Sequence, residues 1–350
     1  MAIPRHFRPV CGIVAGLAVL LACVQVLPVR HAHAQDAARL CSRRHVAQVP
    51  LRNDGGYLSI VAQVAGRDLS LLVDTGSDGG LLTPEMVHRL RLALDPDQQT
   101  VVHGTGGTAH ATPNAIVPDL RIGGIDFGVM SAPVGILPGQ PMITPPVGGL
   151  LGGDILSRFD LDMDVPNGQL GLWEVHAASL ACAQPPAWAG WYDTLPLQRQ
   201  ENRFMLNVRI NGQPVMALLD SGARSRIVSP HVAARLGVPA QQLETDPGGI
   251  TSGIDGHEDV YHWHRFSSLQ IGHELERNTV MTVAPLREGL EMLLGSDWFA
   301  THRVWISYAT GQAFVRPALH TPVPARLASD PVMMPVAPRH APHPASGTRP

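Results

Sequence analysis

Two short loops, each headed by an aspartate, are the residues of this chain best suited to do chemistry. Each loop follows an apolar run of strand character, and the loops are Asp74-Thr75-Gly76 and Asp220-Ser221-Gly222. Backbone amides hold a carboxylate on such a tight loop, and glycine lets another chain segment approach closely. If the two loops meet, the like charges of Asp74 and Asp220 cannot both form, so the pair shares one proton. One aspartate then acts as general base on a water molecule while the other protonates a substrate carbonyl.

Such a pair hydrolyses an amide by direct attack of water, without a metal ion or a covalent intermediate. The chain contains no lysine, which excludes a phosphate-loop lysine, a Schiff-base lysine and a Ser-Lys dyad. A Gly-x-Ser-x-Gly nucleophile elbow is also missing from the sequence. We therefore expect neither a cofactor nor a metal ion to take part.

The two loops head two copies of one pattern. Gly66 and Gly212, each eight residues before its aspartate, lie in sequences typical of a hairpin turn. Thr83-Pro84 and Ser229-Pro230, each nine residues after its aspartate, are typical of a helix N-cap followed by proline. A repeat of about 146 residues is too long for a solenoid and indicates a duplicated domain.

Composition and repeat together predict a mostly β protein with short helices and two homologous lobes related by a pseudo-twofold axis. Glycine (35) and proline (31) are abundant and aromatic residues make up 5%, which favours short strands and turns. The expected divisions are a signal peptide at 1–34, an N-terminal lobe at 35–176, a linker at 177–200, a C-terminal lobe at 201–317 and a Pro-rich disordered tail at 318–350.

The first 34 residues have the features of an export signal. Arg5 gives a basic start, residues 11–26 are mostly apolar, and Ala32-His33-Ala34 is typical of a cleavage site. A membrane anchor is the alternative, but the apolar run is short for one. Lipoprotein processing at Cys23 is a second alternative. We expect a mature chain without a membrane span, located in a periplasm or secreted.

Export would leave two cysteines in the mature chain. Cys41 and Cys182 flank the first copy of the repeat, and in an oxidising compartment two cysteines form a disulfide. Two buried free thiols are the alternative. A catalytic cysteine is disfavoured because the sequence offers no nearby group to lower a thiol pKa.

Several other polar residues have spacings that suggest ion sites. His262 and His264 have ligand-like spacing on a strand, but zinc needs a third ligand, so we expect surface or flap histidines. Asp160, Asp162 and Asp164 also alternate, and we expect them on the solvent face of a strand and not around calcium. The net charge of −3 gives no electrostatic support for binding nucleic acid.

These motifs resemble those of retropepsin-like aspartic proteases, in a bacterial form with both lobes in one chain. The resemblance spans residues 57–317, and its motifs are Leu71-Leu72-Val73-Asp74-Thr75-Gly76-Ser77, Leu218-Leu219-Asp220-Ser221-Gly222-Ala223 and two Leu-Leu-Gly segments that lead to Asp154 and Asp297. It implies two acid-protease-type β-barrel lobes with Asp74 and Asp220 as the catalytic pair. Thr75 and Ser221 would interlock the loops through their hydroxyl groups, with Gly76, Ser77 and Gly222 in support.

The resemblance also implies a flap over the site. Its residues would be His103, Gly104, Thr105, Gly106 and Gly107, with Gly253–Gly256 as a weaker counterpart in the second lobe. Pepsin-like relatives often carry a tyrosine on the flap where this chain has His103. The Gly-Arg-Asn of the retroviral enzymes is replaced by Gly-Gly-Asp154 and Gly-Ser-Asp297, and we expect these two aspartates to cap the brief helix that follows.

The two loops differ at their fourth position, which is Ser77 in the first loop and Ala223 in the second. Ser77 can donate a hydrogen bond to its aspartate and Ala223 cannot. This difference predicts that Asp74 is the more readily ionised member of the pair. The leading hypothesis is an exported, monomeric aspartic endopeptidase acting on peptides or proteins. The alternatives are a catalytically silent peptide-binding protein on the same fold and a metal-dependent hydrolase.

Overall fold

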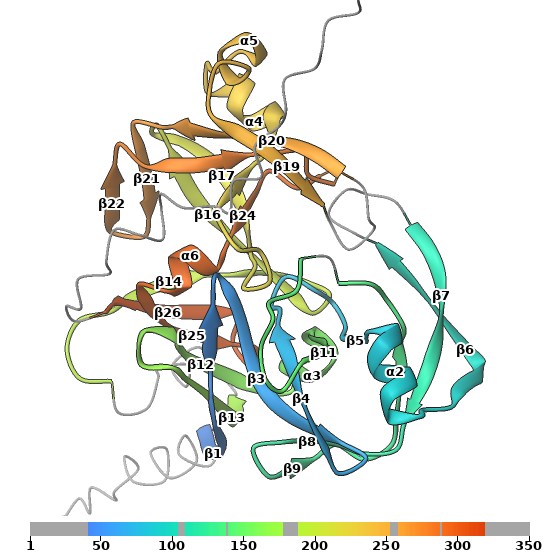
Figure 1. Cartoon of the computed structure of the whole chain (residues 1–350). Coiled ribbons are helices and arrows are strands. Elements are labelled where there is room, and N and C mark those ends of the chain that lie inside the picture. The colour runs from blue at the N-terminus through green and yellow to red at the C-terminus, as the bar shows by residue number, and fades with distance from the viewer. Residues whose placement is uncertain are drawn as a thin grey trace, which may run out of the picture. The chain divides into compact units, whose positions relative to one another are not determined.

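The computed structural model describes residues 41–103, 109–137, 139–177, 188–252, 258–287 and 289–318. All of them belong to the compact unit that spans Leu40–Pro350 (Figure 1). The predicted signal peptide, Cys182, the flap residues Gly104–Gly107 and all but the first residue of the predicted tail lie outside the described residues.

The N-terminal lobe contains a sheet that carries the first aspartate loop. Its strands, in order across the sheet, are β5 (Leu81–Leu82), β11 (Val147–Leu151), β4 (Arg67–Val73), β3 (Tyr57–Val64), β8 (Leu120–Ile122) and β9 (Ile125–Asp126), with β2 (Arg52–Asp54) paired to β3. A second sheet of this lobe has the order β10 (Met130–Pro133), β7 (Ala109–Val117) and β6 (Leu94–His103). β4 runs antiparallel to β3 and parallel to β11.

The C-terminal lobe repeats this arrangement within one larger sheet. Its strands, in order, are β19 (Gly248–Ser252), β20 (Glu258–Arg265), β23 (Val280–Val283), β18 (Ile227–Val228), β24 (Met292–Leu294), β17 (Gln213–Leu219), β16 (Arg203–Ile210), β21 (Ser268–Ile271) and β22 (Glu274–Arg277), with β15 (Gln198–Gln200) paired to β16. As in the first lobe, β17 runs antiparallel to β16 and parallel to β24.

Local sequence explains why the two central hairpins form alike. The turns between their strands have left-handed φ angles at both residues, 51° and 69° at Ala65 and Gly66 and 51° and 77° at Asn211 and Gly212. Two such residues match the twist of a hairpin. β3 and β16 also share one pattern of buried and exposed positions along their eight residues. The same side of each strand therefore faces the core of its lobe, as expected of duplicated domains.

Short helices follow the loops in both lobes. They are α2 (Pro84–Leu90), α3 (Gly153–Leu156), α4 (Pro230–Arg235), α5 (Ala240–Leu243) and α6 (Ser296–Phe299), with the 3-10 turn η1 (Val165–Asn167). The predicted N-caps are confirmed, because the hydroxyls of Thr83 and Ser229 accept hydrogen bonds from backbone amides in the first turns of α2 and α4. Within the described part of the chain, no helix reaches the length and apolarity that crossing a bilayer requires.

A six-stranded sheet takes strands from both lobes (Figure 1). Its order is β1 (Cys41–Pro50), β13 (Gln169–Ala177), β12 (Asp160–Asp164), β25 (His302–Ser307), β26 (Gln312–Pro317) and β14 (Asp193–Pro196). β12 of the first lobe pairs antiparallel with β25 of the second. Residues 193–196 and 198–200, at the end of the predicted linker, form β14 and β15. The two lobes are therefore joined by backbone hydrogen bonds as well as by the chain between them.

This shared sheet overturns the expectation that Asp160, Asp162 and Asp164 face solvent. They are 2%, 7% and 7% exposed. Arg303 of β25 donates to both carboxylate oxygens of Asp162, at 2.8 and 2.5 Å, and lies 3.4 Å from Asp164. The indole of Trp305 donates to Asp160 at 3.3 Å. The acids are buried because the partner strand from the other lobe supplies their cation and donors.

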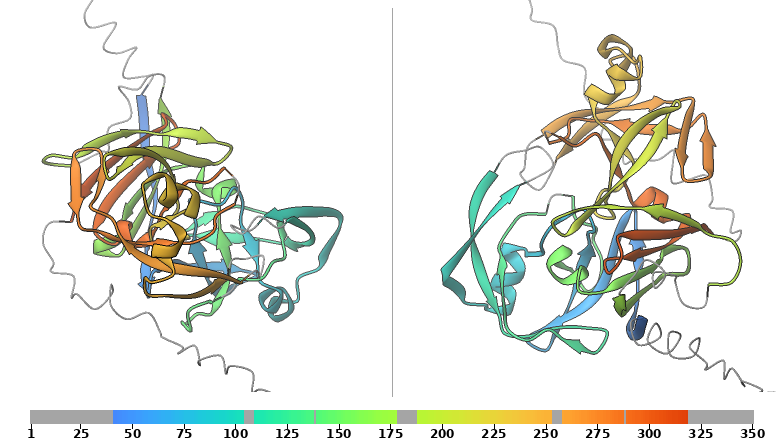
Figure 2. Two further views of the ribbon diagram at one scale, coloured as in Figure 1. Left: turned by 90° about the horizontal axis from the view of Figure 1, so that it is seen from above. Right: turned by 180° about the vertical axis from the view of Figure 1, so that it is seen from behind.

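Two long hairpins extend from the lobes on one side of the molecule. They are β6–β7 and β19–β20, and the strand ends next to their connecting segments point toward each other in Figure 1 and in the right view of Figure 2. In the first hairpin β6 ends at His103 and β7 begins at Ala109. In the second, β19 ends at Ser252 and β20 begins at Glu258. Each hairpin thus leads to the segment for which the resemblance predicted a flap.

Candidate active site

Each aspartate loop begins where a buried central strand ends. Asp74 follows Val73 at the end of β4, and Asp220 follows Leu219 at the end of β17. The amide of each aspartate donates to the last residue of the neighbouring parallel strand, Asp74 to Leu151 at 3.0 Å and Asp220 to Leu294 at 3.1 Å. Both loops are thereby fixed at the same edge of equivalent strand pairs.

The two loops are interlocked through Thr75 and Ser221, as the resemblance implied. The amide of Thr75 donates to the Ser221 hydroxyl at 3.0 Å, and the amide of Ser221 donates to the Thr75 hydroxyl at 3.1 Å. Each hydroxyl then donates across the interface, from Thr75 to the Leu219 carbonyl and from Ser221 to the Val73 carbonyl, both at 2.7 Å. Thr75 and Ser221 are 2% and 1% exposed, so these four bonds are made away from water and hold the loops rigidly.

Gly76 and Gly222 allow the two carboxyl groups to approach. The amide of each glycine donates to the aspartate of its own loop, at 2.9 Å in the first lobe and 3.0 Å in the second. A Cβ placed on Gly76 would lie 2.5 Å from Oδ1 of Asp220, and one on Gly222 would lie 2.5 Å from Oδ2 of Asp74. Each loop therefore needs glycine because the opposite aspartate occupies the space of a side chain.

The carboxyl groups of Asp74 and Asp220 are close enough to share a hydrogen bond. Burial, followed by the charge of Asp220, raises the pKa of Asp74 well above the ordinary value of 3.8. Burial also raises the pKa of Asp220, against the opposing effect of the amides of Ala223 and Gly222. Between its two titrations such a pair holds one proton. The site thus holds an acid and a base side by side.

Ser77 does not play the part that the sequence suggested. Its hydroxyl donates to the carbonyl of Gly79 at 2.8 Å and not to Asp74. The backbone amides of Gly76 and Ser77 lower the pKa of Asp74, and those of Ala223 and Gly222, each 3.0 Å from Oδ1 of Asp220, do the same for Asp220. The prediction that Ser77 makes Asp74 the more readily ionised member is therefore wrong, because both loops offer an amide at this position.

Asp154 and Asp297 lie at the second position of α3 and α6, and the N-cap residues are Gly152 and Gly295. The two aspartates are therefore not N-cap residues, although each accepts a hydrogen bond from an amide in the first turn of its helix, Asp154 from Ile155 at 3.0 Å and Asp297 from Trp298 at 2.9 Å. Oδ1 of Asp154 accepts from the amides of Gly80 and Ile155, at 2.9 and 3.0 Å, and so ties α3 to the first aspartate loop. In the second lobe the guanidinium of Arg226 donates to Asp297 at 2.9 Å.

The predicted surface histidine His264 is buried at 7% exposure, and its Nδ1 lies 2.7 Å from Oδ2 of Asp246. It is therefore a paired core residue. Among the described residues, His, Cys, Asp and Glu side chains form no group of three that could hold a metal ion. The side chains of His103 and Cys41, together with Cys182, Gly104–Gly107 and Gly253–Gly256, lie outside the described residues. The flap and disulfide predictions stay predictions.

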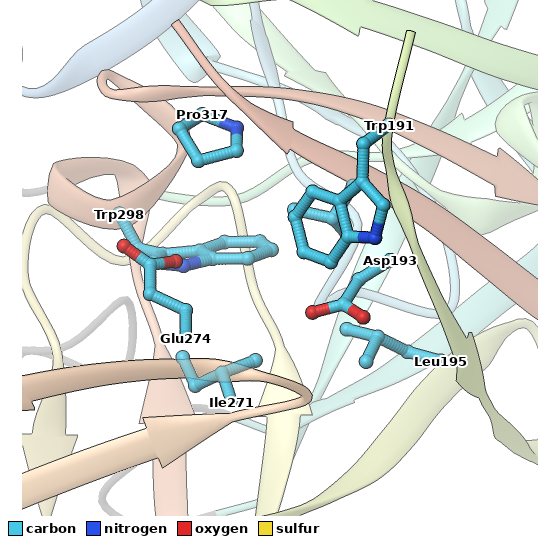
Figure 3. A pocket seen from close by; sticks show the side chains of 8 residues that line it. Trp191, Asp193, Leu195, Ile271, Glu274, Trp298 and Pro317 are labelled. Carbon is cyan, nitrogen blue, oxygen red and sulfur yellow. The ribbon is translucent and has the colours of Figure 1, made fainter.

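A pocket on the second lobe lies apart from the two loops. It is lined by Trp191, Asp193, Leu195, Ile271, Glu274, Trp298, Val315 and Pro317, and Figure 3 shows the indoles of Trp191 and Trp298 on its opposite sides. Its carboxylates are already bonded, Asp193 to His273 and Glu274 to His302. Because neither aspartate of the pair lines this pocket, it is not part of the candidate active site.

Asp78 and Arg224, which follow Ser77 and Ala223, link each loop to the other lobe. This role was not predicted from the sequence. Asp78 binds the turn before β16, where the amide of Asn202 donates to its Oδ1 at 3.1 Å. In the pseudo-symmetric place, the guanidinium of Arg224 donates to the Gly55 carbonyl at 3.1 Å. Asp78 and Arg224 lie at the same distance in sequence from their aspartates, which could have indicated an equivalent role. Their opposite charges made the two positions look unrelated.

Comparison with known protein families agrees with this geometry. The family model described as "aspartyl protease" matches residues 60–155, and the one described as "gag-polyprotein putative aspartyl protease" matches residues 206–301. The two matches are displaced by the same 146 residues that separate Thr75 from Ser221. Each contains one aspartate loop, and together they cover more than half of the chain. A search of the curated proteins found no match. The chain belongs to the retropepsin-like aspartyl protease family and contains two tandem domains of that family.

Proposed function

We propose that this protein is an exported aspartic endopeptidase in which Asp74 and Asp220 hydrolyse peptide bonds. The observation that carries the proposal is the pairing of two aspartates, one from each lobe, on loops that bind each other through Thr75 and Ser221. Membership of an aspartyl protease family supports the same reaction class.

In this mechanism the pair holds one water molecule and one proton. The ionised aspartate takes a proton from the water as it attacks the scissile carbonyl carbon, and the protonated aspartate gives its proton to the carbonyl oxygen. The resulting tetrahedral gem-diol collapses when the aspartate that took the water proton gives it to the amide nitrogen and the C–N bond breaks. The other aspartate takes back the proton of one gem-diol hydroxyl as the new carboxyl group forms, so the pair again holds one proton. Raised pKa values suit this division of labour, because the pair must remain singly protonated at the working pH.

The substrate is proposed to be an extended peptide lying between the lobes. The hairpins β6–β7 and β19–β20 extend on one side of the molecule from opposite lobes, where they are suited to cover a bound chain (Figure 2). A single chain with both aspartates has no need of a second copy to complete the pair, so we propose a monomer. Export and a periplasmic or secreted location rest on the sequence of residues 1–34.

The test is proteolysis of a denatured protein mixture by the purified protein between pH 3 and pH 8. We expect cleavage that a metal chelator leaves unchanged and that a statine-containing peptide, a mimic of the tetrahedral species, suppresses. Binding of peptides without cleavage at any pH would favour the silent peptide-binding protein. Loss of cleavage on chelation would favour a metal-dependent hydrolase.

A further inference from the structure

The residues that face the two aspartates across their hairpins differ between the lobes. In β3–β4 the last paired residues are Ser59 and Leu72. Continuing this register by two residues on each strand brings Tyr57 opposite Asp74. In β16–β17, Met205 pairs with Leu218, and the same step places Arg203 opposite Asp220. Continued past the last paired residues, the register of each hairpin thus runs from Asp74 to an aromatic residue and from Asp220 to a cation.

Arg203 is held in this place by the first lobe. Its Nε lies 2.9 Å from Oδ2 of Asp78, and its side chain is 13% exposed. Asp78 is itself fixed by Asn202, whose backbone amide and side-chain amide donate to it at 3.1 Å each. A guanidinium bound on one side and largely removed from water keeps its charge and its position. Its field acts on Asp220 with little screening.

In the described part of the chain, the position that corresponds to Arg203 is Tyr57, so no charged residue takes this place in the first lobe. There the arginine is Arg224, on the loop of the second lobe, and its guanidinium lies 4.9 Å from the ring centre of Tyr57. Arg224 is exposed, and its Nε donates to the carbonyl of Gly55. The Tyr57 ring thus lies where Arg203 lies in the other half, and the cation is displaced to the surface.

The other charged and titratable groups around the pair preserve this asymmetry. Arg199 of β15 lies 5.7 Å from the ring centre of Tyr308, a residue that follows β25. The Tyr308 hydroxyl is buried without a hydrogen-bond partner, and burial together with the charges of Asp74 and Asp78 raises its pKa, so it stays neutral. Burial raises the pKa of Asp220; the Ala223 amide, the hydrogen bond with Asp74, the Gly222 amide and, as a smaller contribution, the charge of Arg203 lower it.

We propose that Arg203 is a positioning residue that stabilises the ionised form of Asp220 and so leaves the shared proton on Asp74. Asp220 is then the base that activates water, and Asp74 is the acid that protonates the carbonyl. Asp78 holds Arg203 and offsets part of its charge. This assignment rests on the proposed function and replaces the one drawn from Ser77.

The test compares the pH dependence of kcat/KM in four variants. Arg203→Met removes the cation, so both limbs of the profile should move to higher pH, by about 1 unit. Arg203→Lys keeps the charge and should restore the limbs toward their original positions. Asp78→Asn removes a nearby anion and should move both limbs to lower pH. Arg224→Met, the matched control on the opposite side, should leave both limbs in place.

The opposite signs expected for Arg203→Met and Asp78→Asn separate charge from structure. Loosening of the loops alone would lower kcat/KM in both variants without moving the limbs, or would move them in one direction, and either result would overturn the proposal. Carboxyl-carbon NMR of aspartate-labelled protein follows the same titrations without turnover. If the wild-type protein does not cleave peptides, but the NMR titrations of Arg203→Met and Asp78→Asn still shift in opposite directions, the proposed function is refuted and the electrostatic assignment stands.

Discussion

Thr75 and Ser221 each donate a backbone amide to the hydroxyl of the other, at 3.0 and 3.1 Å, from positions 146 residues apart in the chain. This reciprocal pair lies directly after the two aspartates and is buried. It fixes the distance between the lobes at the one place where a small displacement would separate the carboxyl groups. The geometry of the carboxyl pair is therefore set by the loops themselves.

Replacement of Thr75 by valine should weaken both folding and activity. It removes a hydroxyl that both accepts and donates, and leaves the Ser221 amide and the Leu219 carbonyl buried without a partner. Each such group costs about 1–3 kcal/mol, so we expect a loss of about 3 kcal/mol in the free energy of unfolding. Urea denaturation measures this loss. Thr75→Ser keeps the hydroxyl and should cost under about 1 kcal/mol, and equal losses in the two variants would contradict the interlock.

Alanine at Gly76 should abolish activity while the protein remains folded. Its Cβ would lie 2.5 Å from Oδ1 of Asp220, which must then move away from Asp74. We expect kcat/KM to fall by about 10²-fold or more, with circular dichroism unchanged. Gly79→Ala is the matched control in the same loop, because its Cβ would meet no atom closer than 3.9 Å. Unchanged activity in Gly76→Ala would show that the opposite aspartate does not occupy this space.

The repeat made the fold predictable from the sequence. Hairpin turns at Gly66 and Gly212 and N-caps at Thr83 and Ser229 depend on local chemistry, and local chemistry is preserved in both copies. The aspartate loops were found for the same reason. Everything that depends only on residues near one another in the chain could be anticipated by comparing one copy with the other.

Contacts between the copies could not be anticipated in this way. The alternation of Asp160, Asp162 and Asp164 is typical of an exposed face, and only the pairing of β12 with β25 shows that Arg303 covers it. The direction of the Ser77 hydroxyl is likewise a matter of geometry, because Gly79 and Asp74 are both within reach in sequence. Pairing partners far apart in the chain carry no local signal.

Removal of the cation that joins the lobes should destabilise the protein. Arg303→Met leaves the carboxylate of Asp162, 7% exposed, without its two hydrogen bonds. We expect a loss of about 2–4 kcal/mol in the free energy of unfolding, because a buried charge is left unpaired. Arg44→Met is the control, since its ion pair with Glu174 is largely exposed and should cost under about 1 kcal/mol. A loss for Arg303→Met no larger than that of the control would show that this pair does not hold the lobes together.

Stability should fall as the pH rises through the titration of the pair. The pKa values of Asp74 and Asp220 are raised in the folded protein above the ordinary value of 3.8, so the native state binds protons more tightly than the unfolded chain. Unfolding then releases protons, and stability decreases from about pH 4 up to the raised pKa values. Each unit of the shift contributes about 1.4 kcal/mol.

Asp74→Asn removes one member of the pair and should flatten this dependence. In urea denaturation from pH 3 to pH 7, the free energy of unfolding of the variant should rise relative to that of the wild-type protein as the pH rises. Other titrating groups contribute equally to both proteins and cancel in the difference. Parallel stability curves would mean that the two carboxyl groups titrate normally.

The most direct test of the shared site is to replace Asp74 and Asp220 by asparagine, one at a time, and to measure kcat/KM for peptide cleavage. Asparagine keeps the size and most hydrogen bonds of aspartate but cannot hold or release the proton. Each single change should lower kcat/KM by about 10³-fold or more, because neither aspartate can serve as both acid and base. Near-normal cleavage in either variant would show that one lobe works without the other and would contradict the account of a shared pair.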